Sequence, residues 1–178
     1  IIQAEVSTST DNGWTWTHRT ITADITKDNP WTARFAASGQ GIPIQHGPHA
    51  GRLVQQYTIR TAGGAVQAVS VYSDDHGTTW PAGTPIGTGL AANKVVELSD
   101  GSLMLNSRAS DGSGFRKVAH STDGGQTWSE PASDKNLPDS VDNAQIIRAF
   151  PNAAPDDPRA KVLLPSHSPN PKPWSRDR

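Results

Sequence analysis

Short apolar or alternating runs, separated by clusters of Gly, Asp, Ser and Pro, make up most of this chain. Runs of this kind predict β-strands joined by tight turns. No segment keeps a helical period over ten or more residues, so the pattern predicts an all-β fold. The strands are expected at residues 4–8, 52–60, 66–72, 93–98, 103–108 and 115–120.

Two hairpins are predicted from the turns between these strands. The segment Thr61-Ala-Gly-Gly-Ala65 joins the second and third runs, and Asp100-Gly101 joins the fourth and fifth. Asp-Gly between two strand-like runs is a strong hairpin signal. Because the Asp100-Gly101 turn closes one end of its hairpin, position 92 and Arg108 are expected to be neighbours at the open end. Loops are predicted at residues 30–32, 43–52, 134–143 and 151–159.

The pattern Ser-x-Asp-x-Gly-x-Thr-Trp occurs three times, each copy after a predicted strand. Its Asp and Ser side chains can accept hydrogen bonds from backbone N–H groups, and its Gly can adopt a positive φ, so each copy predicts a turn. A calcium loop needs more oxygen ligands than one Asp and one Ser, which favours a structural role over a calcium-binding or catalytic one. The repeated residues are Ser9, Asp11, Gly13, Trp16, Ser73, Asp75, Gly77, Trp80, Ser121, Asp123, Gly125 and Trp128.

The spacing of the three turns predicts a repeat architecture. Their aspartates lie 64 and then 48 residues apart, a spacing typical of arrays of similar units. Strand pairs alternate with the turns, so each unit holds about four strands. Four-stranded antiparallel units in series predict the blades of a β-propeller.

Composition narrows the function classes. A length of 178 residues predicts one domain, residues 1–178. The formal net charge of −1, with both signs mixed along the chain, gives no basic patch for nucleic acid. No apolar run is long enough for a membrane span, and the first residues do not resemble a signal peptide. Cysteine is absent and the six histidines show no ligand spacing, so no metal site is expected.

The three repeats are similar to the Asp boxes of sialidases, and the chain resembles bacterial exo-sialidases (neuraminidases) along essentially its whole length. The run from Lys94 to Gly101, followed by Asn106-Ser-Arg108, carries the most specific resemblance. The family fold it implies is a six-bladed β-propeller. The chain would then supply about three to four four-stranded blades, as the central fragment of a sialidase catalytic domain. The resemblance also covers residues 35–42, 47–53 and 146–150.

The resemblance implies an exo-alpha-sialidase, a glycoside hydrolase that removes terminal sialic acid from glycoconjugates without a cofactor. Such a site has three arginines around the sialic acid carboxylate, a Tyr nucleophile assisted by a Glu, and an Asp acid/base. Arg108 matches the second arginine and Arg176 the third, with Arg178 as an alternative to Arg176. Asn143 is a further candidate for substrate binding, from its position in a predicted loop.

The chain departs from the family pattern at position 92. Ala92 occupies the place of the assisting Glu, and a methyl group cannot accept a proton. Glu97 is no substitute, because five strand residues place it about 16 Å along the strand. The first arginine and the loop Asp correspond to positions before Ile1, and the Tyr to one after Arg178. The chain alone is therefore expected to be inactive.

Two other functions stay open, a non-catalytic sialic-acid or glycan-binding Asp-box propeller and a structural Asp-box protein with no sugar site. The expected partners are sialylated glycans or free sialic acid, together with the remainder of the propeller. The family implies a secreted or cell-surface location. The chain alone is expected to be marginally stable or to aggregate, because an unclosed propeller exposes the faces and edges of its terminal blades.

Overall fold

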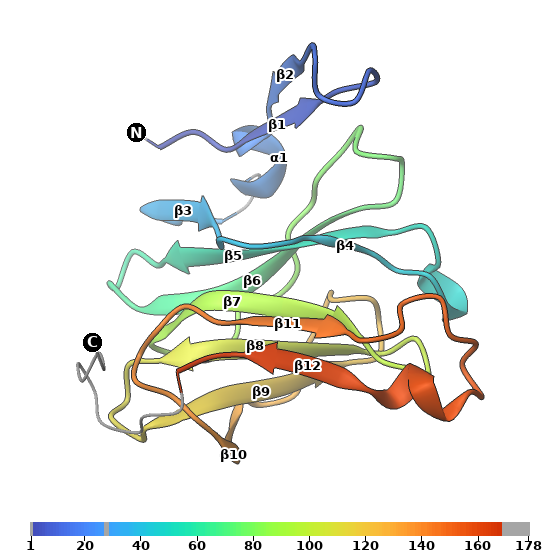
Figure 1. Cartoon of the computed structure of the whole chain (residues 1–178). Coiled ribbons are helices and arrows are strands. Elements are labelled where there is room, and N and C mark those ends of the chain that lie inside the picture. The colour runs from blue at the N-terminus through green and yellow to red at the C-terminus, as the bar shows by residue number, and fades with distance from the viewer. Residues whose placement is uncertain (1, 27–28, 169–178) are drawn as a thin grey trace.

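The computed structural model describes residues 2–26 and 29–168, and these form an all-β structure, as the sequence predicts (Figure 1). Helical segments within these ranges are short: α1 (Thr22–Thr26) and the 3₁₀ turns η1 (Gly47–His49) and η2 (Pro158–Lys161). The strands are β1 (Glu5–Thr8), β2 (Thr17–Thr20), β3 (Ala33–Ala36), β4 (Ile42–Pro43), β5 (Leu53–Arg60), β6 (Val66–Ser73), β7 (Leu90–Glu97), β8 (Leu103–Ala109), β9 (Phe115–Ser121), β10 (Ala132–Pro138), β11 (Gln145–Arg148) and β12 (Leu163–Ser166).

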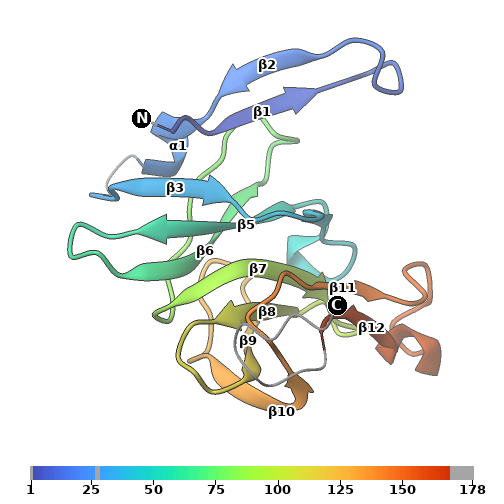
Figure 2. The same ribbon diagram turned by 60° about the vertical axis from the view of Figure 1, so that its left-hand side comes forward.

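The strands form successive antiparallel sheets that do not close into a ring (Figures 1 and 2). One sheet has the order β10-β9-β8-β7. In the sheet before it, β5 pairs with β6 on one edge and with both β3 and β4 on the other. Residues 82–86 add bridges to the free edge of β6. The separate hairpins β1-β2 and β11-β12 flank these two sheets.

This order is that of consecutive blades in an open β-propeller. Within the described residues, two blades are complete and two are present only as hairpins. Strand β7 contacts β5 of the preceding blade and β11 of the following hairpin, and it lies between them in both views (Figures 1 and 2). A site built on β7 therefore draws side chains from three successive sheets.

The predicted loop over residues 134–143 is partly wrong, because its first residues belong to β10. This strand pairs with β9 through a register shift between Asp134 and Pro138. It is an outer edge strand, and none of its seven residues is fully buried. A strand with no buried face has no reason to alternate apolar and polar residues, so its pattern indicated a loop.

Three apolar clusters fill the spaces between successive sheets. The first joins Ile21 and Ile25, in and beside α1, to Tyr57 and Val69 of the next sheet, and it includes Trp31. Two further clusters lie between β5 or β6 and the β7–β9 sheet. Each sheet therefore depends on its neighbour for burial, as in other stacked-repeat folds.

The three Asp boxes form the same hydrogen-bonded turn. In the second box, the Ser73 hydroxyl donates to Asp75 Oδ1 at 2.8 Å and accepts the Gly77 N–H at 2.8 Å. The Asp75 carboxylate also accepts the Thr79 N–H at 2.8 Å and the Thr79 hydroxyl at 2.7 Å. Gly77 has a φ of +88°, a conformation that glycine adopts at low cost. Boxes one and three have the equivalent bonds.

The boxes differ in how they meet the preceding sheet. In the second, Arg19 of β2 donates to the Gly77 carbonyl at 3.1 Å. In the third, Arg52 donates to the carbonyls of Asp123 and Gly124 at 3.0 and 3.2 Å. The indole N–H of Trp128 also reaches across to Ser70 of the preceding sheet, at 3.0 Å. The later two boxes thus tie neighbouring sheets together as well as turning the chain.

These turns predict a loss of stability in acid. Hydrogen bonds from the Thr15 hydroxyl and N–H and from Ser9 lower the pKa of Asp11 from 3.8 to about 2. The same pattern, led by Thr79, lowers the pKa of Asp75 from 3.8 to about 2. The stabilisation is present above the unfolded-state pKa and disappears as the pH falls through the folded-state value. The melting temperature should therefore fall between about pH 4 and pH 2.

An Asp75→Asn variant provides the comparison for this acid effect. It should already melt lower at neutral pH, and its melting temperature should fall less steeply in acid, because one of the titrating groups is gone. Asp156→Asn, at an exposed position, is the control and should follow the unmodified chain. Equal acid slopes for Asp75→Asn and the unmodified chain would contradict the argument.

Candidate functional site

Arg108 lies near the open end of the β7-β8 hairpin, where the register pairs it with Ala91. Its partly buried guanidinium donates through Nη1 to the Val141 carbonyl at 3.4 Å. Its Nε is buried and has no hydrogen-bond partner within residues 2–26 and 29–168. The guanidinium is thus held in place but retains unused donors, which an arginine that binds a ligand requires.

Ala92 lies beside this pair in a β-bulge. The register of β7 against β8 shifts between Ala91 and Lys94, and Ala92 has a φ of +48°. This left-handed conformation is uncommon for residues other than glycine. Bulges occur often beside functional sites, where they change the direction of a side chain. The side chain here is a methyl group, so this position supplies no proton acceptor.

Two further buried cations lie close to Arg108. Lys94 is 2% exposed, and its Nζ donates to the Ser38 carbonyl. Burial, together with the charges of Arg116 and Arg108, lowers the pKa of Lys94. Burial and the charge of Arg108 also lower the pKa of Arg116, against the opposing effect of Asp139. These three side chains, here called the cationic cluster, create a positive field at this end of β7.

Arg116 is fixed by contacts on several sides. It is 1% exposed, its Nε donates to the side-chain oxygen of Asn106, and its Nη1 lies 3.4 Å from Asp139 Oδ1. Nη1 also donates to the Asp142 carbonyl at 3.3 Å. Asp139 is itself 2% exposed, so this is a buried ion pair. The pair anchors the segment after β10 against β8 and β9.

The segment that holds Arg108 is conformationally strained. Val141, whose carbonyl accepts from Arg108, has a φ of +67°. Positive φ is unusual for a β-branched residue. Such strain persists only where the surrounding structure imposes it, and it is frequent at functional sites. Ala92 and Val141 therefore place two strained backbone positions around Arg108.

Asn143 belongs to the same neighbourhood, but on its exposed side. Its Oδ1 accepts from the Ser38 hydroxyl at 3.3 Å, and the carbonyl of Ser38 accepts from Lys94. Gly39 follows with a φ of +113°, and a Cβ there would lie 3.1 Å from Lys94 Nζ. The loop after β3 and the loop before β11 thus meet over the cationic cluster. Arg176 and its alternative Arg178 lie outside the described residues.

Two buried cations at this site, Lys94 and Arg116, were not predicted from the sequence. Lys94 and Arg116 lie inside strands, where a charged side chain usually points to solvent. One available signal was the position of Lys94 within Leu-Ala-Ala-Asn-Lys-Val-Val, a run otherwise without charge. Arg116 has no comparable signal, because its burial results from residues 139–142.

Metal ligands and membrane spans were also not expected, and the described part of the chain contains neither a ligand cluster nor a long apolar helix. There, no group of three or more His, Cys, Asp or Glu side chains is placed to hold a metal ion. No helix in that part is long and apolar enough to cross a bilayer.

Comparison with known proteins places these features in context. The family described as BNR repeat-like domain matches residues 2–176. A sialidase from Micromonospora viridifaciens is 62% identical over 168 residues, which are 94% of this chain and 26% of that protein. The structure of the Hadza microbial sialidase Hz136 superposes with a TM-score of 0.72 at 31% identity, over 82% of this chain and 28% of that one.

A leech intramolecular trans-sialidase complexed with 2,7-anhydro-Neu5Ac is also similar. Its TM-score is 0.67 at 25% identity, over 78% of this chain and 20% of that one. The chain therefore spans about a quarter of the length of the proteins that it matches. These similarities agree with the all-β, unclosed propeller described above.

Proposed function

This chain belongs to the BNR repeat-like domain family, and on that basis we propose that it forms part of the catalytic propeller of an exo-alpha-sialidase. Its homologues are sialidases, so a sialidase-like function holds at the level of the family. The proposal assigns to this chain part of the sialic acid site. Arg108 is the residue that binds the carboxylate of the sugar.

The proposal rests on the incomplete hydrogen bonding of the Arg108 guanidinium. Among the described residues it makes one long hydrogen bond, to Val141, its buried Nε has no partner, and two more cations lie beside it. An incoming carboxylate would supply the missing acceptor and the missing negative charge. The planar fork of an arginine can bind both carboxylate oxygens, which a lysine cannot do.

The described residues supply binding groups rather than a complete catalytic set. Position 92 carries a methyl group. Tyr57 is 5% exposed in the apolar core, and burial raises the pKa of its hydroxyl. Tyr72 packs against Arg52, whose guanidinium carbon lies 4.3 Å from the ring centre. Neither tyrosine is placed beside Arg108 to act as a nucleophile.

We therefore expect this chain to bind free sialic acid without hydrolysing a fluorogenic sialoside. Binding can be followed by NMR during a titration of the purified chain. The methyl ester of sialic acid is the matched control, because it keeps the sugar and removes the negative charge. Equal affinity for acid and ester would contradict the proposed carboxylate site. Turnover of the sialoside would contradict the assignment of the catalytic groups to other parts of the protein.

Ala92 favours a second candidate function, a non-catalytic propeller that recognises sialylated glycans. A carboxylate site that lacks the assisting acid would retain ligands without cleaving them. The two functions differ in the whole protein, where the enzyme would cleave a sialoside and the binding protein would hold it intact. A turnover assay on that protein, beside a binding assay with the same sialoside, separates them.

A further inference from the structure

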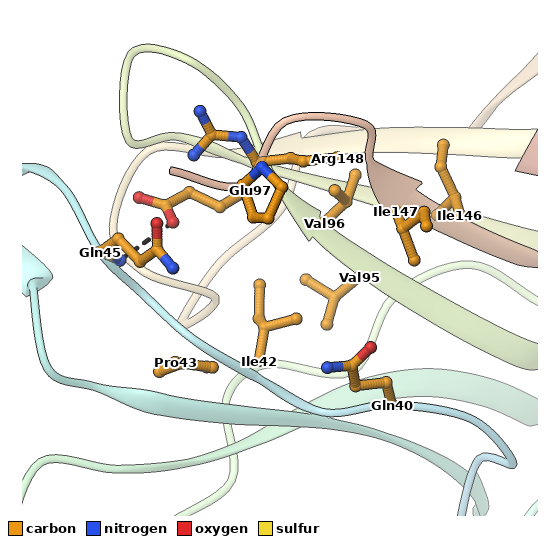
Figure 3. Close-up of a pocket in the computed structure, with 11 residues that line it drawn as sticks. Gln40, Ile42, Pro43, Gln45, Val95, Val96, Glu97, Ile146, Ile147 and Arg148 are labelled. Carbon is orange, nitrogen blue, oxygen red and sulfur yellow. Dashed lines mark hydrogen bonds between the residues drawn. The ribbon is translucent and has the colours of Figure 1, made fainter. Parts of the chain in front are cut away.

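A pocket, drawn in Figure 3, lies near the end of β7 that is away from Arg108. The β7-β8 register pairs Ala91 with Arg108 but pairs Glu97 with Leu103. Six strand residues separate the two ends, a distance of about 20 Å. The pocket has a volume of about 240 Å³ and is lined by residues of β4, β7 and β11. It is thus remote from Arg108, although Lys94 of the cationic cluster precedes Val95 of the pocket along β7.

Arg148, at the end of β11, is a residue of this pocket with unused hydrogen-bond donors. It is 8% exposed, yet its Nε and Nη1 have no hydrogen-bond partner in the part of the chain that the structure describes. Nη2 makes only a long bond of 3.4 Å to the Ala153 carbonyl. Among the described residues, no carboxylate lies within ion-pairing distance of this guanidinium. A buried charge without a counter-ion is costly, so the site favours an added anion.

Glu97 lines the same pocket, but its carboxylate is already engaged elsewhere. It accepts the Gln45 N–H at 2.9 Å, the His46 N–H at 2.8 Å and a contact from His46 Nδ1 at 3.1 Å. In Figure 3 this carboxylate lies beside Gln45, away from the apolar floor of the pocket. A nearby fixed negative charge disfavours a doubly charged ligand. The pocket therefore fits a monoanion better than a phosphate dianion.

The rest of the pocket is mainly apolar. Ile42 of β4, Val95 of β7 and Ile147 of β11 border the space below Arg148, and Gln40 lies at its edge (Figure 3). An apolar pocket with a few convergent polar groups is the usual form of a small-molecule site. Here the polar group is a cation, so the complementary ligand has an apolar body and one negative charge.

We propose that this pocket binds a small organic monocarboxylate, whose carboxylate pairs with Arg148 and whose apolar part packs on Ile42, Val95 and Ile147. The free donors of Arg148 point to a carboxylate because its two oxygens match the guanidinium fork. The proposal does not depend on sialic acid recognition, because Arg148, Ile42, Val95 and Ile147 are not among the residues assigned to sialic acid.

Benzoate is a suitable probe, with benzamide as the uncharged control of the same shape. In a calorimetric or NMR titration of the whole protein, benzoate should bind at least about tenfold more tightly than benzamide, as expected for one charge-assisted pair. Arg148→Met should remove this preference. Arg159→Met, at an exposed arginine paired with Asp157, and Arg108→Met should both leave it unchanged.

A second variant covers the case in which Arg148→Met does not fold. Ile147 is 43% exposed, so Ile147→Glu should fold, and its carboxylate would occupy the pocket beside Arg148. It should weaken benzoate binding by about tenfold or more. The proposal is overturned if the whole protein does not bind benzoate, if benzamide binds equally well, or if Ile147→Glu binds benzoate normally. Loss of benzoate binding in Arg108→Met would place the ligand at the other site and would also overturn it.

Discussion

Replacing Arg108 with methionine is expected to weaken the binding of free sialic acid by about thirtyfold or more. Hydrogen bonds to a charged partner contribute about 1.5–3 kcal/mol each, and about 2 kcal/mol corresponds to thirtyfold in affinity. Methionine retains much of the length of the arginine side chain but removes all of its donors. Titration of the variant with sialic acid, followed by NMR, measures the effect directly.

Three comparisons make this result specific. Arg108→Lys keeps the charge but loses the planar fork, so its affinity should lie between those of the methionine variant and the unmodified chain. Arg60→Met, at an exposed position on β5, should bind sialic acid normally. The melting temperature of each variant shows whether a loss of affinity reflects unfolding. A folded Arg108→Met variant with unchanged affinity would disprove the role given to Arg108.

Replacing Asp139 with alanine is expected to lower the free energy of unfolding by about 3–5 kcal/mol, the usual cost of breaking a buried ion pair from one side. Asp139 is 2% exposed and Arg116 is 1% exposed, with 3.4 Å between their nearest charged atoms. Without Asp139, Arg116 would remain buried next to the positive charges of Lys94 and Arg108. Urea denaturation of the two proteins measures the difference.

A double replacement tests the cause of this destabilisation. Arg116→Met combined with Asp139→Leu removes both charges and should recover much of the lost stability, because an apolar pair often substitutes for a buried ion pair. The control Asp156→Ala, at an exposed position, should change stability by less than about 0.5 kcal/mol. If Asp139→Ala behaves like this control, the ion pair does not support the site.

The fold was largely predictable because its signals are local. Strands β5, β6, β7 and β8 are mostly buried between sheets, so they appear in the sequence as long β-favouring runs, and the Asp100-Gly101 turn fixes one hairpin. The boxes carry their hydrogen-bond partners within a few residues of sequence. Strand β10 was missed because an exposed edge strand is held by backbone hydrogen bonds, which leave no side-chain pattern.

The site was predictable only where it depends on a single hairpin. The juxtaposition of Arg108 with the segment around position 92 follows from the turn at Asp100-Gly101, and the register places Ala91 opposite Arg108. The bulge at Ala92 and the burial of Lys94 were not predictable in this way. Lys94 bonds to Ser38, 56 residues away, and Ser38 bonds to Asn143, 105 residues away. Contacts of this range arise from the stacking of sheets.

The three Asp boxes differ in their contacts with the neighbouring sheet, and this difference determines which box could accept an inserted peptide. Trp14 at the first box is 87% exposed, so an epitope inserted at that tip would project into solvent. At the third box, a Cβ on Gly124 would already lie 2.8 Å from Arg52 Nη1 and 2.9 Å from His49 Cγ. An epitope inserted there would break the contacts of Arg52 with the third box and so separate the β5-β6 sheet from the β7–β10 sheet. The first box should therefore accept a reporter tag and the third should not, although the two turns have nearly the same sequence.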